Sequence, residues 1–366
     1  MLRRTCGQSS GQTVKRIFFR VIFAFGLVSG LSGCIGVGYY AQSLKGHVEI
    51  MTARQDVDHL IDDASTPEAL RAAMASARAI RQFATDALDL PDNASYRSYV
   101  DIGRDYVTWA VFAAPEFSVV PRVWCFPVFG CVPYRGYFSR DVAIKTAVEL
   151  QRQGLDLHVS GVTAYSTLGW SSDPLLSTML RQDESSLAGL VFHELAHQRV
   201  YVDDDTAFNE AFAVAVETTG VKTWLRAGGD AAGLGRYQTG LARNAQFLAL
   251  VAQTRDELHQ VYQGAGTVAH KRAAKAAAID RLRLRYRQMR DKRWGGFSGY
   301  DGWIEAPINN AKIAATSVYN DRVPAFLRLF ELCVGNYPRF YNAVERIGAI
   351  AKADRAEALE VAKACE

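Results

Sequence analysis

The sequence has little net charge, few cysteines and no internal repeat. Its 366 residues include 42 Lys or Arg and 38 Asp or Glu, and the first 33 residues contain no acid. Residues 34–366 hold 37 basic and 38 acidic side chains, a near-neutral body that gives no electrostatic case for nucleic-acid binding. The ordinary composition, with no repeats or low-complexity tracts, excludes collagen, coiled coils, disordered tails and multi-span membrane proteins.

The first 33 residues are typical of a secretory signal. A basic segment ends at Arg20, an apolar stretch follows over residues 21–30, and small residues lead to Cys34. The ending Leu-Ser-Gly-Cys resembles the lipobox of bacterial lipoproteins, in which cleavage leaves the Cys as a lipidated first residue. This resemblance implies a lipid on Cys34 and a body that faces the periplasm. Ile35 replaces the Asp that tends to retain lipoproteins at the inner membrane, which favours the outer membrane.

An uncleaved membrane anchor is the alternative. Residues 21–44 carry no charge, and a segment of that length can cross a bilayer. Its several glycines and serines make it a poor span. Both interpretations place the body outside the cytoplasm.

Four cysteines remain after the signal and Cys34 are set aside. Cys125 and Cys131 enclose a turn containing Pro and Gly, so a disulfide between them is predicted in an oxidising compartment. Their spacing differs from Cys-x-x-Cys, which disfavours a structural zinc or a redox centre. Cys333 and Cys365 are a second candidate pair, which would tie down the carboxyl terminus.

Helical periodicity dominates the body. Two aromatic and β-branched segments, residues 106–120 and 155–168, indicate strands. We therefore expect one mostly helical α+β domain over residues 34–366, with a small β-sheet beside a central helix pair and a helical C-terminal part over 236–366. The expected helices span residues 66–88, 140–153, 183–201, 207–226, 236–262, 267–292, 307–332 and 337–364.

Residues 193–197 read His-Glu-Leu-Ala-His. On a helix, His193 and His197 lie on one face, one turn apart, so their imidazoles can bind one Zn²⁺ from the same side. Glu194 lies beside that face, where its carboxylate can take a proton from a water molecule that the metal has activated. A chance match to this motif in a chain of this length has odds of order 1%. The motif therefore predicts a zinc site with Glu194 as general base.

A catalytic zinc needs a third protein ligand and an open position for water. Among the acids that follow the motif at short range, the candidates are Asp205, Glu210 and Glu217. Glu210 and Glu217 are seven residues apart and share a helix face. Glu217 is better suited to hydrogen-bond a ligand histidine, or simply to face solvent.

Residues 209–213 read Asn-Glu-Ala-Phe-Ala and resemble the Asn-Glu-x-Phe-Ala element of gluzincin aminopeptidases, whose Glu is the third zinc ligand. This resemblance implies Glu210 as that ligand. Together with Gly-Tyr-Tyr-Ala-Gln at residues 38–42, the pattern is similar to a bacterial family of predicted zinc aminopeptidases over nearly the whole chain after the signal. The resemblance implies a zincin-like metallopeptidase fold and a peptide substrate.

Two features depart from the well-studied gluzincins. The connector between His197 and Glu210 is shorter, and the Gly-Ala-Met-Glu-Asn motif that grips a substrate's free amine is absent. Residues 161–169 stand in roughly its place and could form an edge strand that pairs with substrate, but they contain no acid. Hydrolysis of a peptide-like bond is therefore better supported than exopeptidase specificity.

The oxyanion of such a reaction needs a donor besides the metal, and gluzincins commonly use Tyr or His. The candidates are Tyr165, Tyr201 and Tyr319, although any one of 16 tyrosines is more often a packing residue. The sequence thus favours a zinc-dependent peptidase on the bacterial envelope. The alternatives are an endopeptidase or amidase acting on peptidoglycan or another envelope amide, and a non-catalytic envelope interaction protein.

Overall fold

The computed structural model describes residues 37–126, 130–203, 205–317, 322–363 and 365. The chain divides into two compact units, Met1–Glu49 and Ile50–Glu366. Helix α2 (Val37–Thr52) begins in the first unit. The signal predicted from the sequence, with its lipobox and Cys34, lies outside the described residues. None of the helices in the described ranges is long and apolar enough to cross a membrane.

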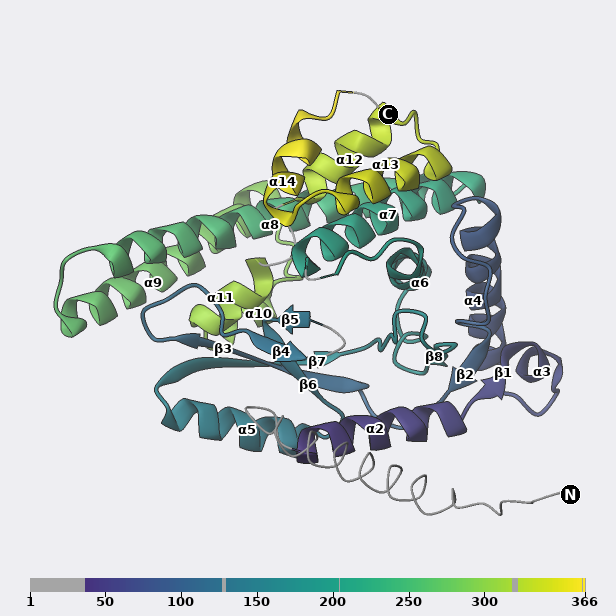
Figure 1. Ribbon diagram of the computed structural model, residues 1–366, viewed down its shortest axis with the longest axis horizontal. Helices are drawn as coiled ribbons and strands as arrows, with labels where there is room; N and C mark the ends of the chain where they lie inside the picture. Colours follow the sequence, from purple (N-terminus) through teal and green to yellow (C-terminus); the bar gives the residue numbers. More distant parts are fainter. Residues whose placement is uncertain (1–36, 127–129, 204, 318–321, 364, 366) are drawn as a thin grey trace, which may run out of the picture. The chain divides into compact units, whose positions relative to one another are not determined.

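Small sheets form part of the second unit (Figure 1). The longest strands, β3 (Thr108–Pro115) and β7 (Leu155–Val162), pair antiparallel, and β6 (Tyr134–Tyr137) pairs with the other edge of β3. A second sheet has the order β1 (Gln55–Asp56), β2 (Ser98–Val100), β8 (Leu175–Leu176). The strands β4 (Trp124–Phe126) and β5 (Gly130–Val132) form a hairpin that pairs Cys125 with Cys131.

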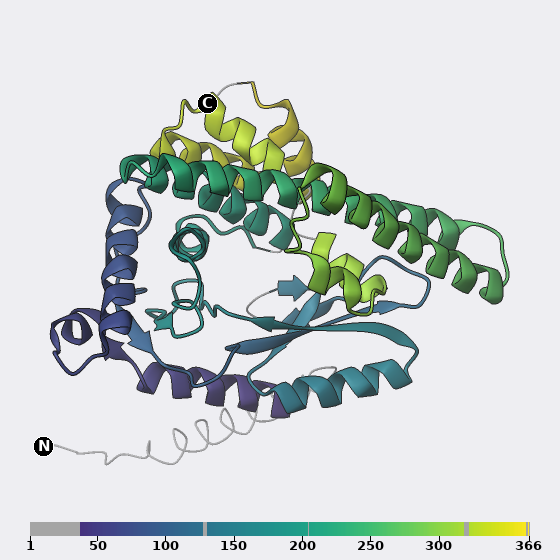
Figure 2. The same cartoon turned by 180° about the vertical axis from the view of Figure 1, so that it is seen from behind.

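Helices cover both faces of the β6-β3-β7 sheet (Figures 1 and 2). Helix α5 (Arg140–Arg152) lies along one face. On the other face, α11 (Asn310–Ser317) packs through Ala311 against Ala110, Phe112 and Ala114 of β3. A sheet buried on both faces needs apolar residues on both, and residues 110–114 of β3 are all buried.

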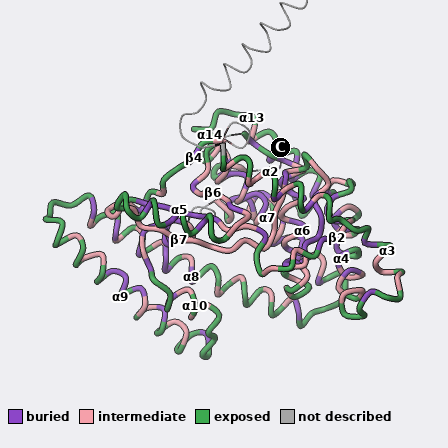
Figure 3. The backbone as a smooth tube through the Cα atoms, turned by 90° about the horizontal axis from the view of Figure 1, so that it is seen from below, coloured by how far each residue is buried: buried purple, intermediate pink, exposed green. Residues whose placement is uncertain are grey.

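The main core surrounds the helix pair α6 (Glu184–Arg199) and α7 (Thr206–Ala227), as the buried residues in Figure 3 show. Helices α3 (Val57–Asp62) and α4 (Glu68–Asp86) contribute to the same core. The two central helices approach closely because glycine stands at their contact. A Cβ on Gly220 would lie 2.7 Å from a ring carbon of Phe192 on α6.

The C-terminal half is helical. Helices α8 (Ala231–Gln263) and α9 (Val268–Arg293) form a long antiparallel hairpin that projects from the core of the unit (Figure 2). It is followed by α10 (Asp301–Glu305), α11, α12 (Val323–Leu332), α13 (Tyr337–Ala349) and α14 (Lys352–Val361). Cys333, at the end of α12, is bonded to Cys365.

The prediction of a mostly helical α+β body with small sheets is confirmed, but two predicted helices are wrong. The element expected over 307–332 is two helices, α11 and α12, and Pro324 lies in the first turn of α12, where proline favours a helix start. The element expected over 337–364 is broken because Ile350 and Ala351 are extended, with ψ of 169° and 140°. Gly348 stands in the last turn of α13, two residues before Ile350.

Candidate metal centre

Helix α6 carries both histidines of the His-Glu-Leu-Ala-His segment. It starts after Asp183, whose carboxylate caps the helix by accepting a hydrogen bond from the backbone N–H of Ser186 (3.1 Å). The rings of His193 and His197 meet edge to face one turn apart, with their Nε2 atoms 3.2 Å apart. Because apolar residues surround α6, His197 is only 5% exposed. The helix therefore presents two imidazole nitrogens at one buried point.

Helix α7 brings Glu210 to the same point. The carboxylate oxygens of Glu210 lie 3.4 Å from Nε2 of His193 and 3.9 Å from Nε2 of His197. Zinc bonds of about 2.0–2.1 Å in tetrahedral geometry separate the ligand atoms by about 3.3–3.4 Å. The three observed separations bracket this value. Two imidazoles and one carboxylate, with ligand atoms within 4.8 Å of one another, thus fit a small divalent cation.

The first turn of α7 is fixed by two buried polar residues. Asn209 accepts a hydrogen bond from the N–H of Val202 and donates one to its carbonyl, each at 2.8 Å. Asp205 is the N-cap of α7, and its 2%-exposed carboxylate forms ion pairs with Arg322 and Arg355, both at 3.2 Å. Asn209 precedes Glu210 by one residue, and Asp205 precedes it by about one helical turn. Their contacts therefore fix the part of α7 that carries Glu210. They also show that Asp205 pairs with arginines rather than with the histidines.

Glu217, the other alternative ligand, contacts the far side of a histidine. Its Oε2 lies 3.1 Å from Nδ1 of His193, the ring nitrogen opposite to the one that faces Glu210. A carboxylate at this position fixes the orientation of a ligand imidazole and raises its basicity. Gly189 makes room for it, because a Cβ there would lie 3.1 Å from Cγ of Glu217. The interpretation of Glu217 as a hydrogen-bond partner of a histidine agrees with this geometry.

The charges at this site favour a cation. In the described part of the chain, no Lys or Arg forms an ion pair with Glu194, Glu210 or Glu217. Burial opposes a charge on His193, but hydrogen bonds with Glu210 and Glu217 raise its pKa well above the ordinary value. Burial, together with the neighbouring His193, lowers the pKa of His197 to about 4. Several carboxylates around buried imidazoles thus create a negative potential that a divalent cation would offset.

Glu194 is half-buried beside the cluster. Burial is the main reason that its pKa rises to about 7, and the charge of His193 acts in the opposite direction. A carboxyl group with a pKa near neutrality can both accept and return a proton at physiological pH. The hydroxyl of Ser166, from the segment after β7, acts against this rise and lowers the pKa of Glu194.

The remaining residues singled out from the sequence are two cysteines and three tyrosines. The structure joins Cys125 to Cys131. Tyr165 packs edge to face on Phe138 with 5.2 Å between ring centroids, and burial raises its pKa to about 12. Tyr201 is 41% exposed, and Tyr319 lies outside the described residues. The choice of an oxyanion donor among these tyrosines stays a prediction.

Sequence reasoning missed the residues that support the cluster. Asn209 belongs to the Asn-Glu-Ala-Phe-Ala segment, and its position directly before Glu210 indicated a role at the site. Its hydrogen bonds to Val202 could not be predicted from the sequence. Gly189 precedes His193 by one helical turn, and a glycine inside a buried helix often marks a close approach. Both act through tertiary contacts.

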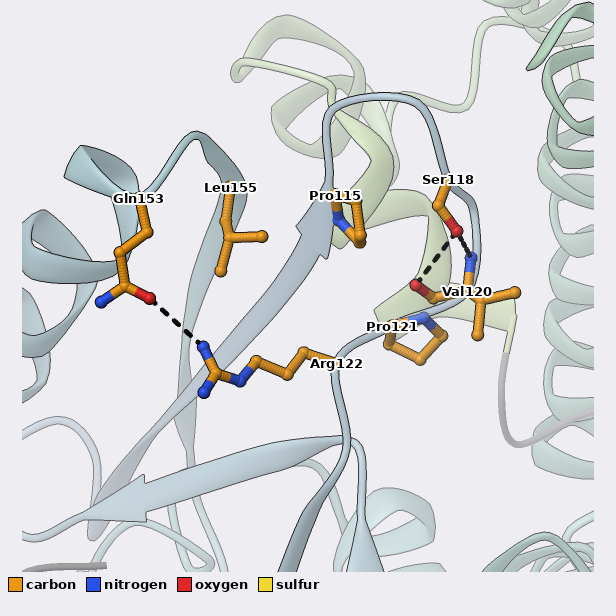
Figure 4. A pocket seen from close by; sticks show the side chains of 7 residues that line it. All are labelled: Pro115, Ser118, Val120, Pro121, Arg122, Gln153 and Leu155. Carbon is orange, nitrogen blue, oxygen red and sulfur yellow. Dashed lines mark hydrogen bonds between the residues drawn. The ribbon is translucent and has the colours of Figure 1, made fainter. Parts of the chain in front are cut away.

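A separate cavity of about 400 Å³ lies at one end of the β3–β7 pair (Figure 4). Pro115, Arg122 and Leu155 are among its lining residues, and Arg122 donates to Oε1 of Gln153 at 3.5 Å. It shares no residue with the metal cluster. This cavity therefore adds nothing to the chemistry of the histidine site.

Comparison with known proteins gives one match. The model of a family described as "Putative aminopeptidase" matches residues 38–359, which include α6, α7 and the whole cluster. The chain matches no curated protein and no solved structure.

Proposed function

The chain belongs to this aminopeptidase family, and from that premise we propose that it is a zinc-dependent peptidase with Glu194 as its general base. One observation carries the proposal. Ligand atoms of His193, His197 and Glu210 lie within 4.8 Å of one another, with the half-buried carboxyl group of Glu194 next to them.

Zinc is the metal that this set of ligands favours. Two imidazoles and one carboxylate are typical of catalytic zinc sites, whereas calcium and magnesium favour sites made of oxygen ligands alone. A zinc ion held there would polarise the scissile carbonyl and lower the pKa of water. A zincin-like fold, expected from the resemblance to gluzincins, is part of the same proposal.

The side chains around the cluster have distinct tasks in this proposal. Glu194 takes a proton from the attacking water and returns it to the leaving amine, for which a pKa of about 7 is suited. Glu217 holds the His193 ring so that Nε2 stays directed at Glu210 and His197. The surrounding apolar core excludes bulk water and strengthens these electrostatic interactions.

The proposed location is the bacterial envelope. The lipobox-like sequence that ends at Cys34 supports a lipid anchor, with the outer membrane favoured and the body facing the periplasm. Labelling of the protein by a lipid precursor, lost in Cys34→Ser, would support this location. Equal labelling of both proteins would contradict it.

The test of the function compares the wild type with Glu194→Gln on two peptide libraries, one with free and one with acetylated amino termini. We expect the wild type to cleave peptides, and Glu194→Gln to lose at least about 100-fold in kcat while it retains zinc, because the amide cannot accept the proton. Loss of cleavage on acetylated peptides would identify an aminopeptidase, and equal cleavage an endopeptidase. A Glu194→Gln variant as fast as the wild type would refute the proposed role of Glu194.

A further inference from the structure

Tyr96 is a buried tyrosine whose hydroxyl has no structural task. It lies in the connection between α4 and β2 and is 2% exposed. Its phenol oxygen is buried and makes no hydrogen bond within the described residues. A buried polar atom without a partner costs free energy, since it loses its hydrogen bonds to water. Phenylalanine would fill the same space without that cost, so packing alone does not explain the hydroxyl.

The backbone at Tyr96 is also unfavourable. Its φ of 64° places it in the left-handed region, which a bulky residue rarely adopts. Such conformations persist where the surrounding structure imposes them, and they occur often at functional sites. Two unfavourable features at one residue, the backbone and the hydroxyl, call for one explanation.

The connection is built to hold Tyr96 in place. Arg81 on α4 is 2% exposed, and its guanidinium donates to the carbonyls of Ser95 (2.9 Å), Pro91 (2.7 Å) and Asn93 (3.1 Å). On the other side, the N–H of Tyr96 donates to the carbonyl of Asp173 at 2.6 Å. The buried guanidinium of Arg81 therefore donates most of its hydrogen bonds to this short segment. These bonds fix the backbone that carries Tyr96.

The neighbours of the phenol belong to the candidate active site. Gln198 of α6 accepts a hydrogen bond from Asn93 at 2.8 Å and donates one to Ser95 at 3.4 Å, which holds the segment before Tyr96 against the helix that carries Glu194. Burial and then the charge of Glu194 raise the pKa of Tyr96 well above its ordinary value, in agreement with this placement. Ser166 lies beside both residues, but its hydroxyl donates to Asp173 and accepts from the N–H of Leu168, each at 3.1 Å. The O–H of Tyr96 is therefore an uncommitted donor near the carboxyl group of Glu194.

We propose that Tyr96 is a positioning residue for Glu194, whose carboxylate accepts the phenol O–H as a hydrogen bond when substrate is bound. This inference rests on the proposed peptidase function. Hydrogen bonds of this kind are often too long in a free enzyme and tighten in the substrate complex. In that complex the bond would hold Glu194 in the orientation that takes the proton from water, while Ser166 remains bound to Asp173.

The test compares Tyr96→Phe with Tyr341→Phe. Tyr341 is equally buried, but its hydroxyl donates to the carbonyl of Leu88 at 2.7 Å, far along the chain from the catalytic residues. We measure zinc content, the melting temperature, and kcat and KM on a peptide that the wild type cleaves. For Tyr96→Phe we expect unchanged zinc, a melting temperature within about 2 °C of the wild type or above it, and kcat at least about tenfold lower at similar KM. For Tyr341→Phe we expect a lower melting temperature and unchanged kcat.

The outcomes separate this inference from the proposed function. If the wild type binds zinc but cleaves no peptide, the proposed function fails and the inference fails with it. If the wild type is active and Tyr96→Phe keeps its kcat, only the inference fails. A Tyr96→Phe variant that loses stability and activity together would also overturn it, because the hydroxyl would then have a structural task.

Discussion

Glu217 offers the sharpest test of how the protein supports its proposed metal ligands. Its carboxylate lies 3.1 Å from Nδ1 of His193, and the side chain is 35% exposed. Loss of such a partner typically weakens metal binding 10- to 100-fold, about 1.4–2.7 kcal/mol. Partial exposure lets water replace the carboxylate, so we expect Glu217→Ala to lie near the tenfold end of this range. Glu217→Gln keeps an acceptor oxygen and loses only the charge, so its effect should be smaller, about threefold.

The assay is zinc affinity measured by competition with a chelator on the purified full chain. Glu184→Gln is the matched control, because that carboxylate lies in the first turn of α6 and accepts from Nε1 of Trp224 at 3.0 Å, without contact to a histidine. It should leave zinc affinity unchanged. Equal zinc affinity in the wild type and Glu217→Ala would refute the reasoning, whatever the effect on stability.

Three further predictions concern the same fold. Gly189→Ala places a methyl group 3.1 Å from Cγ of Glu217, so we expect this variant to bind zinc more weakly than the wild type. Adding Glu217→Ala to it should weaken zinc binding no further, and additive losses in the double variant would contradict this. Asp205→Ala leaves two arginines without their buried partner, and we expect about 3–5 kcal/mol less stability by urea unfolding; a loss below about 1 kcal/mol would be contrary to it. Burial and the nearby Lys312 lower the pKa of His158 from 6.5 to about 4, so the unfolded state binds more protons between these values. The wild type should therefore lose stability relative to His158→Phe as pH falls from about 6.5 to 4, and a pH-independent difference would contradict this.

The sequence predicted the helical part of the site well. The spacing of His193 and His197 depends on helix periodicity alone, and α6 begins and ends within two residues of the predicted bounds. Glu210 was implied by the resemblance of its segment to a known element, and α7 delivers it to the two histidines. Local periodicity and a short motif were sufficient to predict that these three residues lie together; their role as metal ligands stays a prediction.

The rest depends on contacts between distant segments. The pairing of Asn209 with Val202, the space left by Gly189 and the place of Tyr96 all arise from tertiary packing. Tyr96 is 98 residues before Glu194 and shares no motif with it, so the sequence pointed to other tyrosines. The break at Ile350 was missed because alanine-rich periodicity continues across it, although Gly348 stands two residues before it.

The most direct test of the central claim is the metal content of the purified wild type beside His193→Ala. We predict about one zinc per chain in the wild type, and its loss in the variant, which removes one of the three ligands while α6 keeps its helical residues. Circular dichroism would show that the variant is folded. A folded wild type that holds no zinc after incubation with the metal, or a His193→Ala variant that retains it, would contradict the account.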